Sequence, residues 1–117
     1  MTEIAWKLAD RTEWEAARAT GAYAGSAVDR ADGFIHLSTA AQAAETARRH
    51  YAGRTNLVLA AVDLSKAEAV KWEASRGGDL FPHLYAPLPF AAVGVEHHLS
   101  VDDEGAMRFE DEGVQWP

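Results

Sequence analysis

The stretch Leu57-Val58-Leu59-Ala60-Ala61-Val62-Asp63-Leu64 is apolar at every position except Asp63. It is rich in residues that strands accept, and it is short for a helix. Such a run is typical of a strand that is covered on both of its faces. We therefore expect residues 57–64 to form a central strand of a sheet.

Two helices are predicted before this strand. Thr12 with Glu15, and Thr39 with Gln42, each have the spacing of a capping box, in which the side chains of both residues bond backbone N–H groups. The first helix should end near residue 21. The second should continue to residue 53, because its alanines recur at helical spacing and allow close packing against a sheet.

Further strands are predicted over residues 4–8, 34–38, 70–73 and 93–99, with a hairpin over 101–109. Residues 21–32 show no periodicity and indicate a loop. Prolines at 82, 87 and 89 argue against a regular central strand over 81–89. Because helices and strands do not alternate strictly, the class expected is α+β, as one domain over 1–117 with flanking helices.

Composition excludes several classes of protein. The chain has 117 residues and no cysteine, so a disulfide framework and a thiolate nucleophile are excluded. No segment has the apolar length of a membrane span or the pattern of a signal peptide, so we expect a cytoplasmic protein that does not enter membranes. The net charge of −7 falls mainly on residues 101–117, where one base and six acids give 1 − 6 = −5. Extended nucleic-acid binding is therefore not expected, and this acidic segment should be dispensable for folding.

His36 is the first candidate for chemistry. On a strand, Phe34, His36 and Ser38 share one face and Ile35 the other, so His36 and Ser38 should point together into a cleft. The helix that begins after Ser38 offers free backbone N–H groups, which suit an anion. The alternative is a histidine bonded to a backbone carbonyl, beside hydroxyls that only cap the helix.

His83 and Tyr85 form the second candidate, in the segment Phe81-Pro82-His83-Leu84-Tyr85. Two residues apart, they should lie on one face, in a stretch whose prolines indicate a role other than sheet packing. The alternative is a proline-shaped turn with an aromatic residue over the core. Glu73 is the candidate carboxylate, or else an exposed acid paired with Lys71 or Arg76. We expect His36 and His83 to line one pocket, because a shared ligand explains both local irregularities.

These segments together resemble a known family. The chain is similar to the bacterial domain-of-unknown-function family 952 over about residues 6–99. The residues that carry the resemblance are Trp14, Gly21-x-Tyr23-x-Gly25-Ser26, Asp29, Asp32-Gly33-Phe34-Ile35-His36-Leu37-Ser38-Thr39 with Gln42, Lys71-Trp72-Glu73 and Phe81–Tyr85. The resemblance implies an ADP-ribosyltransferase-like fold with a bent, split mixed sheet. The block Ile35–Ser38 also resembles the histidine-leucine-serine block of the RNA 2′-phosphotransferases, which use NAD.

The resemblance implies a site that takes NAD or another ADP-ribose-type nucleotide as cofactor or ligand. A transferase would use His36, Glu73 and His83 as catalytic groups, with no metal required. Two alternatives remain: a non-catalytic nucleotide-binding or protein-binding module, since the chain has no R-S-E motif, and a small histidine-dependent hydrolase or isomerase. The residues expected to contact the ligand are Tyr23, Ser26, Asp29, Ser38, Thr39, Gln42 and Tyr85.

Overall fold

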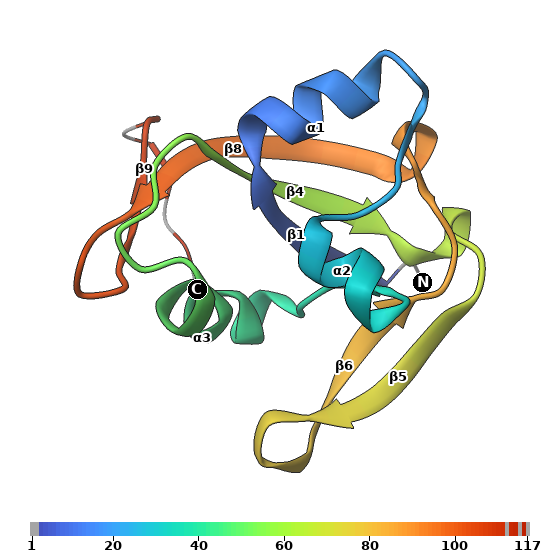
Figure 1. Cartoon of the computed structure of the whole chain (residues 1–117). Coiled ribbons are helices and arrows are strands. Elements are labelled where there is room, and N and C mark those ends of the chain that lie inside the picture. Colours follow the sequence, from blue (N-terminus) through green and yellow to red (C-terminus); the bar gives the residue numbers. More distant parts are fainter. Residues whose placement is uncertain (1–2, 112, 115, 117) are drawn as a thin grey trace.

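The computed structural model describes residues 3–111, 113, 114 and 116, apart from the side chain of Arg76. Three helices and nine strands follow one another among short 3₁₀ turns (Figure 1). Helices α1, α2 and α3 span Arg11–Arg18, Ala27–Asp32 and Ala40–His50. The strands are β1 (Ile4–Asp10), β2 (Ala22–Tyr23), β3 (Ile35–His36), β4 (Leu57–Asp63), β5 (Val70–Ser75), β6 (Asp79–Leu84), β7 (Leu88–Pro89), β8 (Val93–Val101) and β9 (Met107–Phe109).

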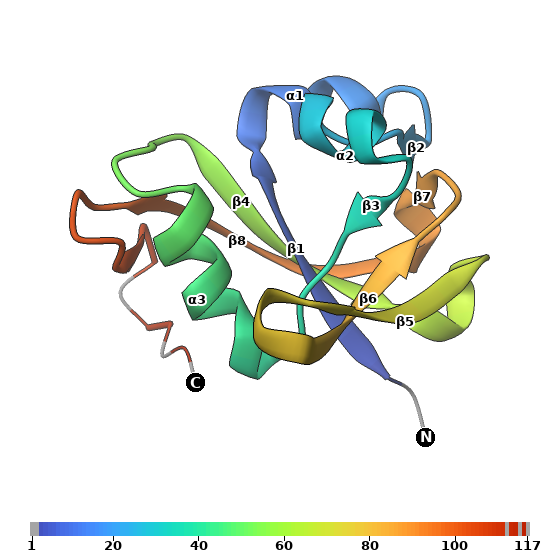
Figure 2. The same ribbon diagram turned by 60° about the horizontal axis from the view of Figure 1, so that its bottom comes forward.

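The largest sheet has the strand order β1-β4-β8-β9, so β4 lies inside it as predicted. Leu57 through Val62 are buried, because the strand carries apolar side chains on both of its faces. Val58, Ala60 and Val62 enter a first core with Trp14 of α1. Leu57 and Leu59 enter a second core, which α3 covers (Figure 2). The central strand therefore holds two apolar layers together.

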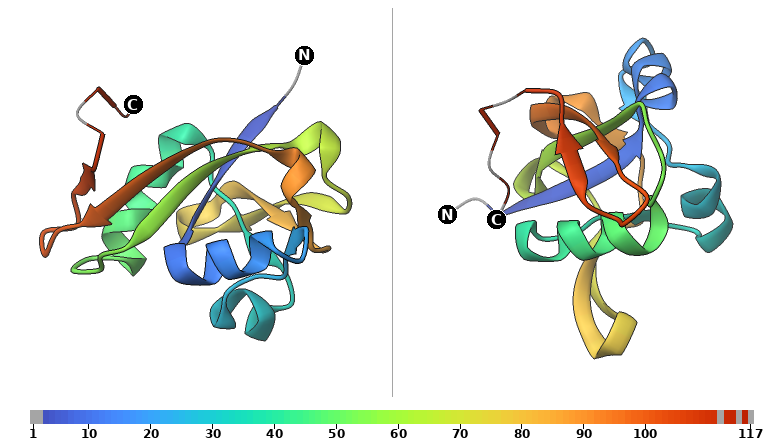
Figure 3. Two further views of the ribbon diagram at one scale, coloured as in Figure 1. Left: turned by 90° about the horizontal axis from the view of Figure 1, so that it is seen from above. Right: turned by 90° about the vertical axis from the view of Figure 1, so that its left-hand side faces the viewer.

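A second sheet has the order β3-β6-β5, and its β5–β6 hairpin projects from the body of the molecule (Figures 1 and 3). The sequence expectation that prolines keep this stretch out of a central strand is wrong for Pro82. The Pro82 carbonyl accepts a hydrogen bond from Leu37 N at 3.1 Å. The nitrogen and the carbonyl of an extended residue point to the same side of the strand. The nitrogen of Pro82, which carries no hydrogen, therefore points toward Leu37, just past the two residues of β3, and not toward β5. The β5–β6 ladder is left intact.

All pairings between the named strands are antiparallel, where a mixed sheet was expected. The reason lies in the helical connections. Helix α1 joins β1 to β2, α2 joins β2 to β3, and α3 joins β3 to β4. In each case the two strands belong to different sheets. A helical crossover within one sheet, which produces parallel strands, is thus missing among the described residues.

Two local expectations change at the helices. The segment predicted as a loop contains α2, whose six residues are too few to show helical periodicity; Ser26 and Asp29 form its capping box. Gly33 ends α2 with φ of 87°, a conformation that favours glycine, and directs the chain into β3. Helix α1 is capped by Asp10 in place of the predicted Thr12, because the helix begins at Arg11 and Thr12 is already its second residue. Thr12 receives a hydrogen bond from Asn56.

The acidic segment that was expected to be dispensable packs against the second core. The predicted hairpin is present, with Val101 opposite Met107, and Val101 is buried. Phe109 and Trp116 lie against the second core, and the ring of Trp116 meets that of Trp6 edge-on at 4.6 Å. The acidic side chains that the structure describes here are exposed, apart from the partly buried Asp102, while the apolar residues between them complete the fold.

No helix among the described residues has the length and apolar character to cross a membrane.

Candidate functional site

The site is built where β3 pairs with β6. His36 lies directly opposite His83 in this ladder, and their ring centroids are 5.8 Å apart. The sequence expectation that the two histidines lie together is confirmed in this respect. They differ in exposure: the side chain of His36 is 37% exposed, and that of His83 is 8% exposed. His36 can meet a ligand directly, whereas His83 supports the site from beneath.

Asp29 fixes the orientation of His36. Its Oδ1 atom lies 2.6 Å from His36 Nδ1 and accepts from the His36 backbone N–H at 3.1 Å. Its Oδ2 atom accepts from Lys7 Nζ at 2.9 Å. Burial raises the pKa of Asp29, but the hydrogen bond with His36 and the Lys7 ammonium outweigh burial, so this pKa lies well below its usual range. The carboxylate is therefore a fixed negative charge beneath the imidazole.

Lys7 is the residue of this network that sequence reasoning missed. It occupies a position between Ala5 and Ala9 on the first-core face of β1 and is only 2% exposed. Burial lowers its pKa, and Asp29 partly offsets this effect. Its ammonium also donates to the His36 carbonyl oxygen at 3.1 Å. In the sequence, Lys7 alternates with Ala5 and Ala9 on one face of β1, and this pattern could have indicated a buried lysine.

A second carboxylate faces the other ring nitrogen of His36. Asp32 Oδ2 lies 2.9 Å from His36 Nε2, and Asp32 is the last residue of α2. An imidazole can donate to two carboxylates at once only when it is protonated. Since Asp32 is about half exposed, a ligand could displace it and take the Nε2 position.

His83 is held in the same manner from the neighbouring strand. Glu73 Oε1, on β5, lies 2.8 Å from His83 Nδ1 and accepts from the Tyr85 hydroxyl at 2.5 Å. The hydrogen bond from Tyr85 and, after it, the bond with His83 lower the pKa of Glu73. The hydrogen bond with Glu73 raises the pKa of Tyr85. The alternative interpretation of Glu73 from the sequence is an ion pair with Lys71 or Arg76. Lys71 Nζ lies instead over the Tyr85 ring, 4.9 Å from its centroid, and the Arg76 side chain lies outside the described part of the chain.

Phe34 joins the two halves of the site. Its ring stacks on His83 at 4.0 Å and also contacts His36 at 4.6 Å and Tyr85 at 5.2 Å. The sequence placed Phe34 on the His36 face but gave it no role. We refer to the six residues Asp29, Phe34, His36, Glu73, His83 and Tyr85 as the paired-histidine cluster.

An open hollow of about 260 Å³ adjoins this cluster. Asp29, Phe34 and Tyr85 form part of its wall, together with Arg30 and the segment 84–87. The imidazoles of His36 and His83 are not part of the wall. The expected pocket lined by both rings is therefore replaced by a hollow beside the cluster.

Ser38, Thr39 and Gln42 serve α3 rather than this cluster. Strand β3 ends at His36, and Ser38 then pairs with Trp6 of β1, so the alternation of side chains does not continue. Ser38 Oγ lies 3.0 Å from Thr46 Oγ1 on α3. Thr39 and Gln42 form the predicted capping box, and Gln42 Nε2 also donates to the Leu80 carbonyl at 2.8 Å. The expectation that Ser38 points into the cleft with His36 is therefore wrong.

Tyr23 and Ser26 also have structural positions. Tyr23 is 2% exposed and packs on Trp14, with ring centroids 5.0 Å apart, which excludes it from stacking on a ligand in this conformation. Burial raises the pKa of its hydroxyl, which has no hydrogen-bond partner among the described residues. Ser26 caps α2 and receives the Asp29 N–H at 3.1 Å. It acts on the site through Asp29.

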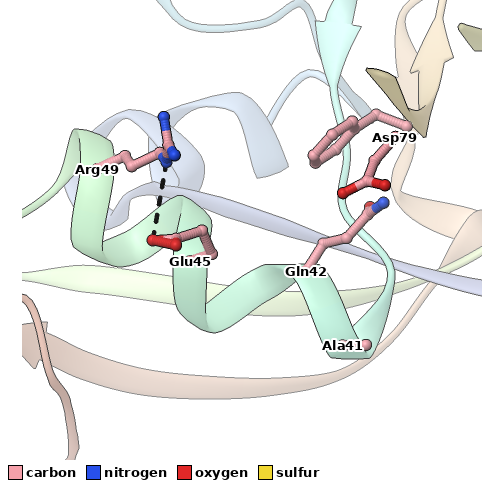
Figure 4. Close-up of a pocket in the computed structure, with 6 residues that line it drawn as sticks. Ala41, Gln42, Glu45, Arg49 and Asp79 are labelled. Atoms are coloured by element: carbon pink, nitrogen blue, oxygen red, sulfur yellow. Dashed lines mark ion pairs between the residues drawn. The ribbon is translucent and has the colours of Figure 1, made fainter. Parts of the chain in front are cut away.

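A second hollow, of about 230 Å³, lies between α3 and the beginning of β6 (Figure 4). Gln42 points from α3 toward Asp79, and Glu45 faces Arg49 with 3.7 Å between Oε1 and Nε. The wall is formed by side chains of mixed charge. No group of three potential metal-ligating side chains occurs within the described residues.

The fold and the cluster define a small α+β protein with two carboxylate-supported histidines on adjacent strands. The chain belongs to the family described as Protein of unknown function (DUF952), whose model matches residues 8–95. It is similar to protein CC0527 from Caulobacter crescentus, a structural genomics target. The crystal structure of that protein has 51% identity and a TM-score of 0.83, over 90% of this chain and 93% of that one. Its solution NMR structure has 52% identity and a TM-score of 0.76, over 88% and 90%. A comparison with curated proteins gave no match.

Proposed function

We propose that the paired-histidine cluster binds a ribose-containing nucleotide of the NAD or ADP-ribose type and acts on it as a transferase. One observation carries this proposal: two imidazoles 5.8 Å apart, each held through Nδ1 by a carboxylate. A carboxylate on one ring nitrogen fixes the orientation of an imidazole and supports proton transfer at the other. The resemblance of residues 35–38 to enzymes that use NAD supports the choice of ligand.

The hollow offers contacts for each part of such a ligand. Tyr85 is 39% exposed and, with Phe34, presents aromatic surface on which a nicotinamide or adenine ring can stack. Arg30 lies in the same wall and can pair with a phosphate. A volume of about 260 Å³ suits one ring and its ribose, while the second half of a dinucleotide would extend over the surface.

In this proposal His36 and Glu73 contact the reacting ribose. His36 donates to a ribose or phosphate oxygen through Nε2 after Asp32 moves aside, and Asp29 keeps the ring in place. Glu73 accepts a ribose hydroxyl and stabilises positive charge on the sugar as the bond to nicotinamide weakens. His83 positions Glu73. A cytoplasmic location, where NAD is abundant, belongs to the same proposal.

A second candidate is a hydrolase or isomerase that uses His36 and His83 as an acid and base pair. The adjacency of the two rings, which meet edge-on with centroids 5.8 Å apart, favours it, because an acid and a base have to reach one substrate group together. It requires Phe34 to move, since that ring covers His83. A binding module without turnover is the third reading.

The test is isothermal titration calorimetry of the full chain with NAD, ADP-ribose, nicotinamide and a 2′-phosphorylated nucleotide. We expect ADP-ribose or NAD to bind, and His36→Ala to weaken binding by about 5- to 150-fold, which corresponds to the loss of about 1–3 kcal/mol for a buried hydrogen-bond partner. His98→Ala is the matched control, because His98 lies on β8, outside the cluster.

Chromatography of NAD incubated with the protein then separates the candidates. Release of nicotinamide without an equal amount of free ADP-ribose, lost in Glu73→Gln, supports the transferase, because the ADP-ribosyl group has then passed to a nucleophile of the protein. Release with an equal amount of free ADP-ribose means that water is the acceptor and supports the hydrolase. Tight binding without release supports the binding module. If none of the four compounds binds, or if His36→Ala binds them as well as the parent does, the nucleotide proposal is abandoned.

A further inference from the structure

Strand β5 lies at the outer edge of the β3-β6-β5 sheet. The backbone pattern shows which of its residues face outward. Tyr85 N donates to the carbonyl of Ala69, which lies opposite it in the register, so hydrogen-bonded pairs fall at 69, 71, 73 and 75. Val70, Trp72 and Ala74 therefore direct their N–H and C=O groups away from β6. An edge of this kind is a template for another strand.

The side chains at this edge are unusually apolar for a projecting hairpin. Trp72 is 40% exposed, and Leu80, on the same face of β6, is 55% exposed. The opposite face of β5 carries Lys71 and Glu73, one residue to each side of Trp72. Exposed aromatic surface beside an open strand edge marks an interaction site.

We propose that β5 pairs with β5 of a second copy of this chain, antiparallel and centred on Trp72. In this register Trp72 faces Trp72 of the other copy, and Val70 faces Ala74. All three outward-facing residues are used, and the two sheets join into one. The partner is a second copy because the charges of β5 are complementary to themselves when the strand is reversed.

That complementarity also selects the register. Centred on Trp72, each Lys71 lies opposite Glu73 of the other copy, which gives two opposite-charge pairs. A slip that still matches the outward-facing groups centres the pair on Lys71 or on Glu73, and then places two like charges directly opposite each other. Both hydrogen bonds that Glu73 makes with described side chains use Oε1, so the second copy's Lys71 would approach Oε2, next to the paired-histidine cluster.

The interface is small. A stable interface buries about 800 Å² per partner, and a pair of six-residue strands covers less. We therefore expect a reversible dimer that forms at high micromolar concentrations. Sedimentation velocity over a dilution series should show a monomer–dimer equilibrium.

Charge reversal tests the pairing. Lys71→Glu alone and Glu73→Lys alone each place like charges opposite each other, so each should self-associate at least about tenfold more weakly than the parent. A mixture of the two variants restores both opposite-charge pairs and should form a heterodimer. Circular dichroism of each variant checks that it is folded. A parent chain that remains monomeric at millimolar concentration, or a mixture that associates no better than its components, overturns the proposal.

Disulfide formation tests the register, because the chain has no cysteine of its own. Hydrogen-bonded partners have Cα atoms about 5.5 Å apart, within the range that a disulfide spans. The double variant Val70→Cys with Ala74→Cys should therefore form a covalent dimer on oxidation, since residue 70 faces residue 74 of the other copy. Each single variant is the matched control and should remain unlinked. Equal crosslinking of the single and double variants overturns the register.

Discussion

A lysine ammonium inside a protein keeps its charge only where a carboxylate faces it. Lys7 and Asp29 are both 2% exposed, and their charged atoms are 2.9 Å apart. Asp29 also holds His36, so one carboxylate joins a structural ion pair to the candidate site. Stability and site geometry therefore depend on the same residue.

We predict that Asp29→Asn lowers the free energy of unfolding by about 3–5 kcal/mol, because it leaves the Lys7 ammonium buried opposite a neutral amide. Urea unfolding at pH 7 measures this loss. The double variant Lys7→Met with Asp29→Asn should recover a large part of it, since the unpaired charge is removed. A loss below about 1 kcal/mol in the single variant would contradict this account of the pair.

The same prediction has a pH dependence. The pKa of Asp29 is lower in the folded chain than in the unfolded chain, so its contribution to stability is complete above about pH 4 and declines as the pH falls. The difference in stability between the parent and Asp29→Asn should therefore shrink below pH 4. A constant difference down to pH 2 would show that the Asp29 charge is not its source.

At the scale of elements, the C-terminal hairpin differs most from its composition. Six of the residues in 101–117 are acidic, which predicted a solvated tail, yet Val101, Phe109 and Trp116 belong to the second core. The pairing of β8 with β9 places Val101, Met107 and Phe109 at this core, and Trp116 packs against it from beyond β9.

We predict that a chain truncated after Asp102 loses about 3 kcal/mol of unfolding free energy or more, as expected when buried aromatic packing is removed. Arg108→Ala is the control. It removes only the exposed ion pair with Asp102, so it should cost less than about 1 kcal/mol. Thermal unfolding of both variants provides the measurement. Equal stability of the truncated and full chains would restore the interpretation of a dispensable tail.

Long helices and strands, which repeat their pattern several times, could be predicted from the sequence. The type or the end of a short element could not. β4 was predicted from the largely apolar run 57–64, of which Leu57–Asp63 form the strand, and α3 from its capping box and alanines. Helix α2 has six residues, too few to reveal its type. Strand β3 has two, so a strand was predicted there but its end was not. The error at Ser38 follows from this: alternation was extended past His36, where the strand stops.

The candidate site could be predicted only in part for a related reason. His36 and His83 stood out because local packing did not explain them, and they proved to be direct cross-strand neighbours. Lys7 and Asp32 did not stand out, because their roles depend on contacts made by the folded chain. The pairing of Lys7 with Asp29 spans 22 residues, which no local pattern reports.

At the scale of the whole molecule, β4 connects two cores that share no buried residue. Val58 points into the first core, and Val101 belongs to the second. Because the strand that carries Val58 also carries Leu57 and Leu59 of the second core, loss of either core should unfold the other. We expect one cooperative unit.

We predict that Val58→Ala and Val101→Ala each cost about 2 kcal/mol, from two lost methyl groups and the remaining cavity. Their effects should add within about 0.5 kcal/mol in the double variant. Transitions followed by tryptophan fluorescence and by far-UV circular dichroism should coincide in each variant. Val28→Ala is the control, since Val28 is 64% exposed. Separate transitions for the two probes would mean that the cores unfold independently.

The contact between Trp6 and Trp116 also has a consequence for biosynthesis. After a ribosome has made Trp6, it must add 110 further residues (116 − 6) before the second indole exists. Although the first core draws only on residues up to Val93, it shares β4 with the second core, so neither core is stable until Phe109 and Trp116 have been made. During translation, the surface of β1 that awaits them is open to other proteins, and a chaperone or a neighbouring nascent chain would meet it there first.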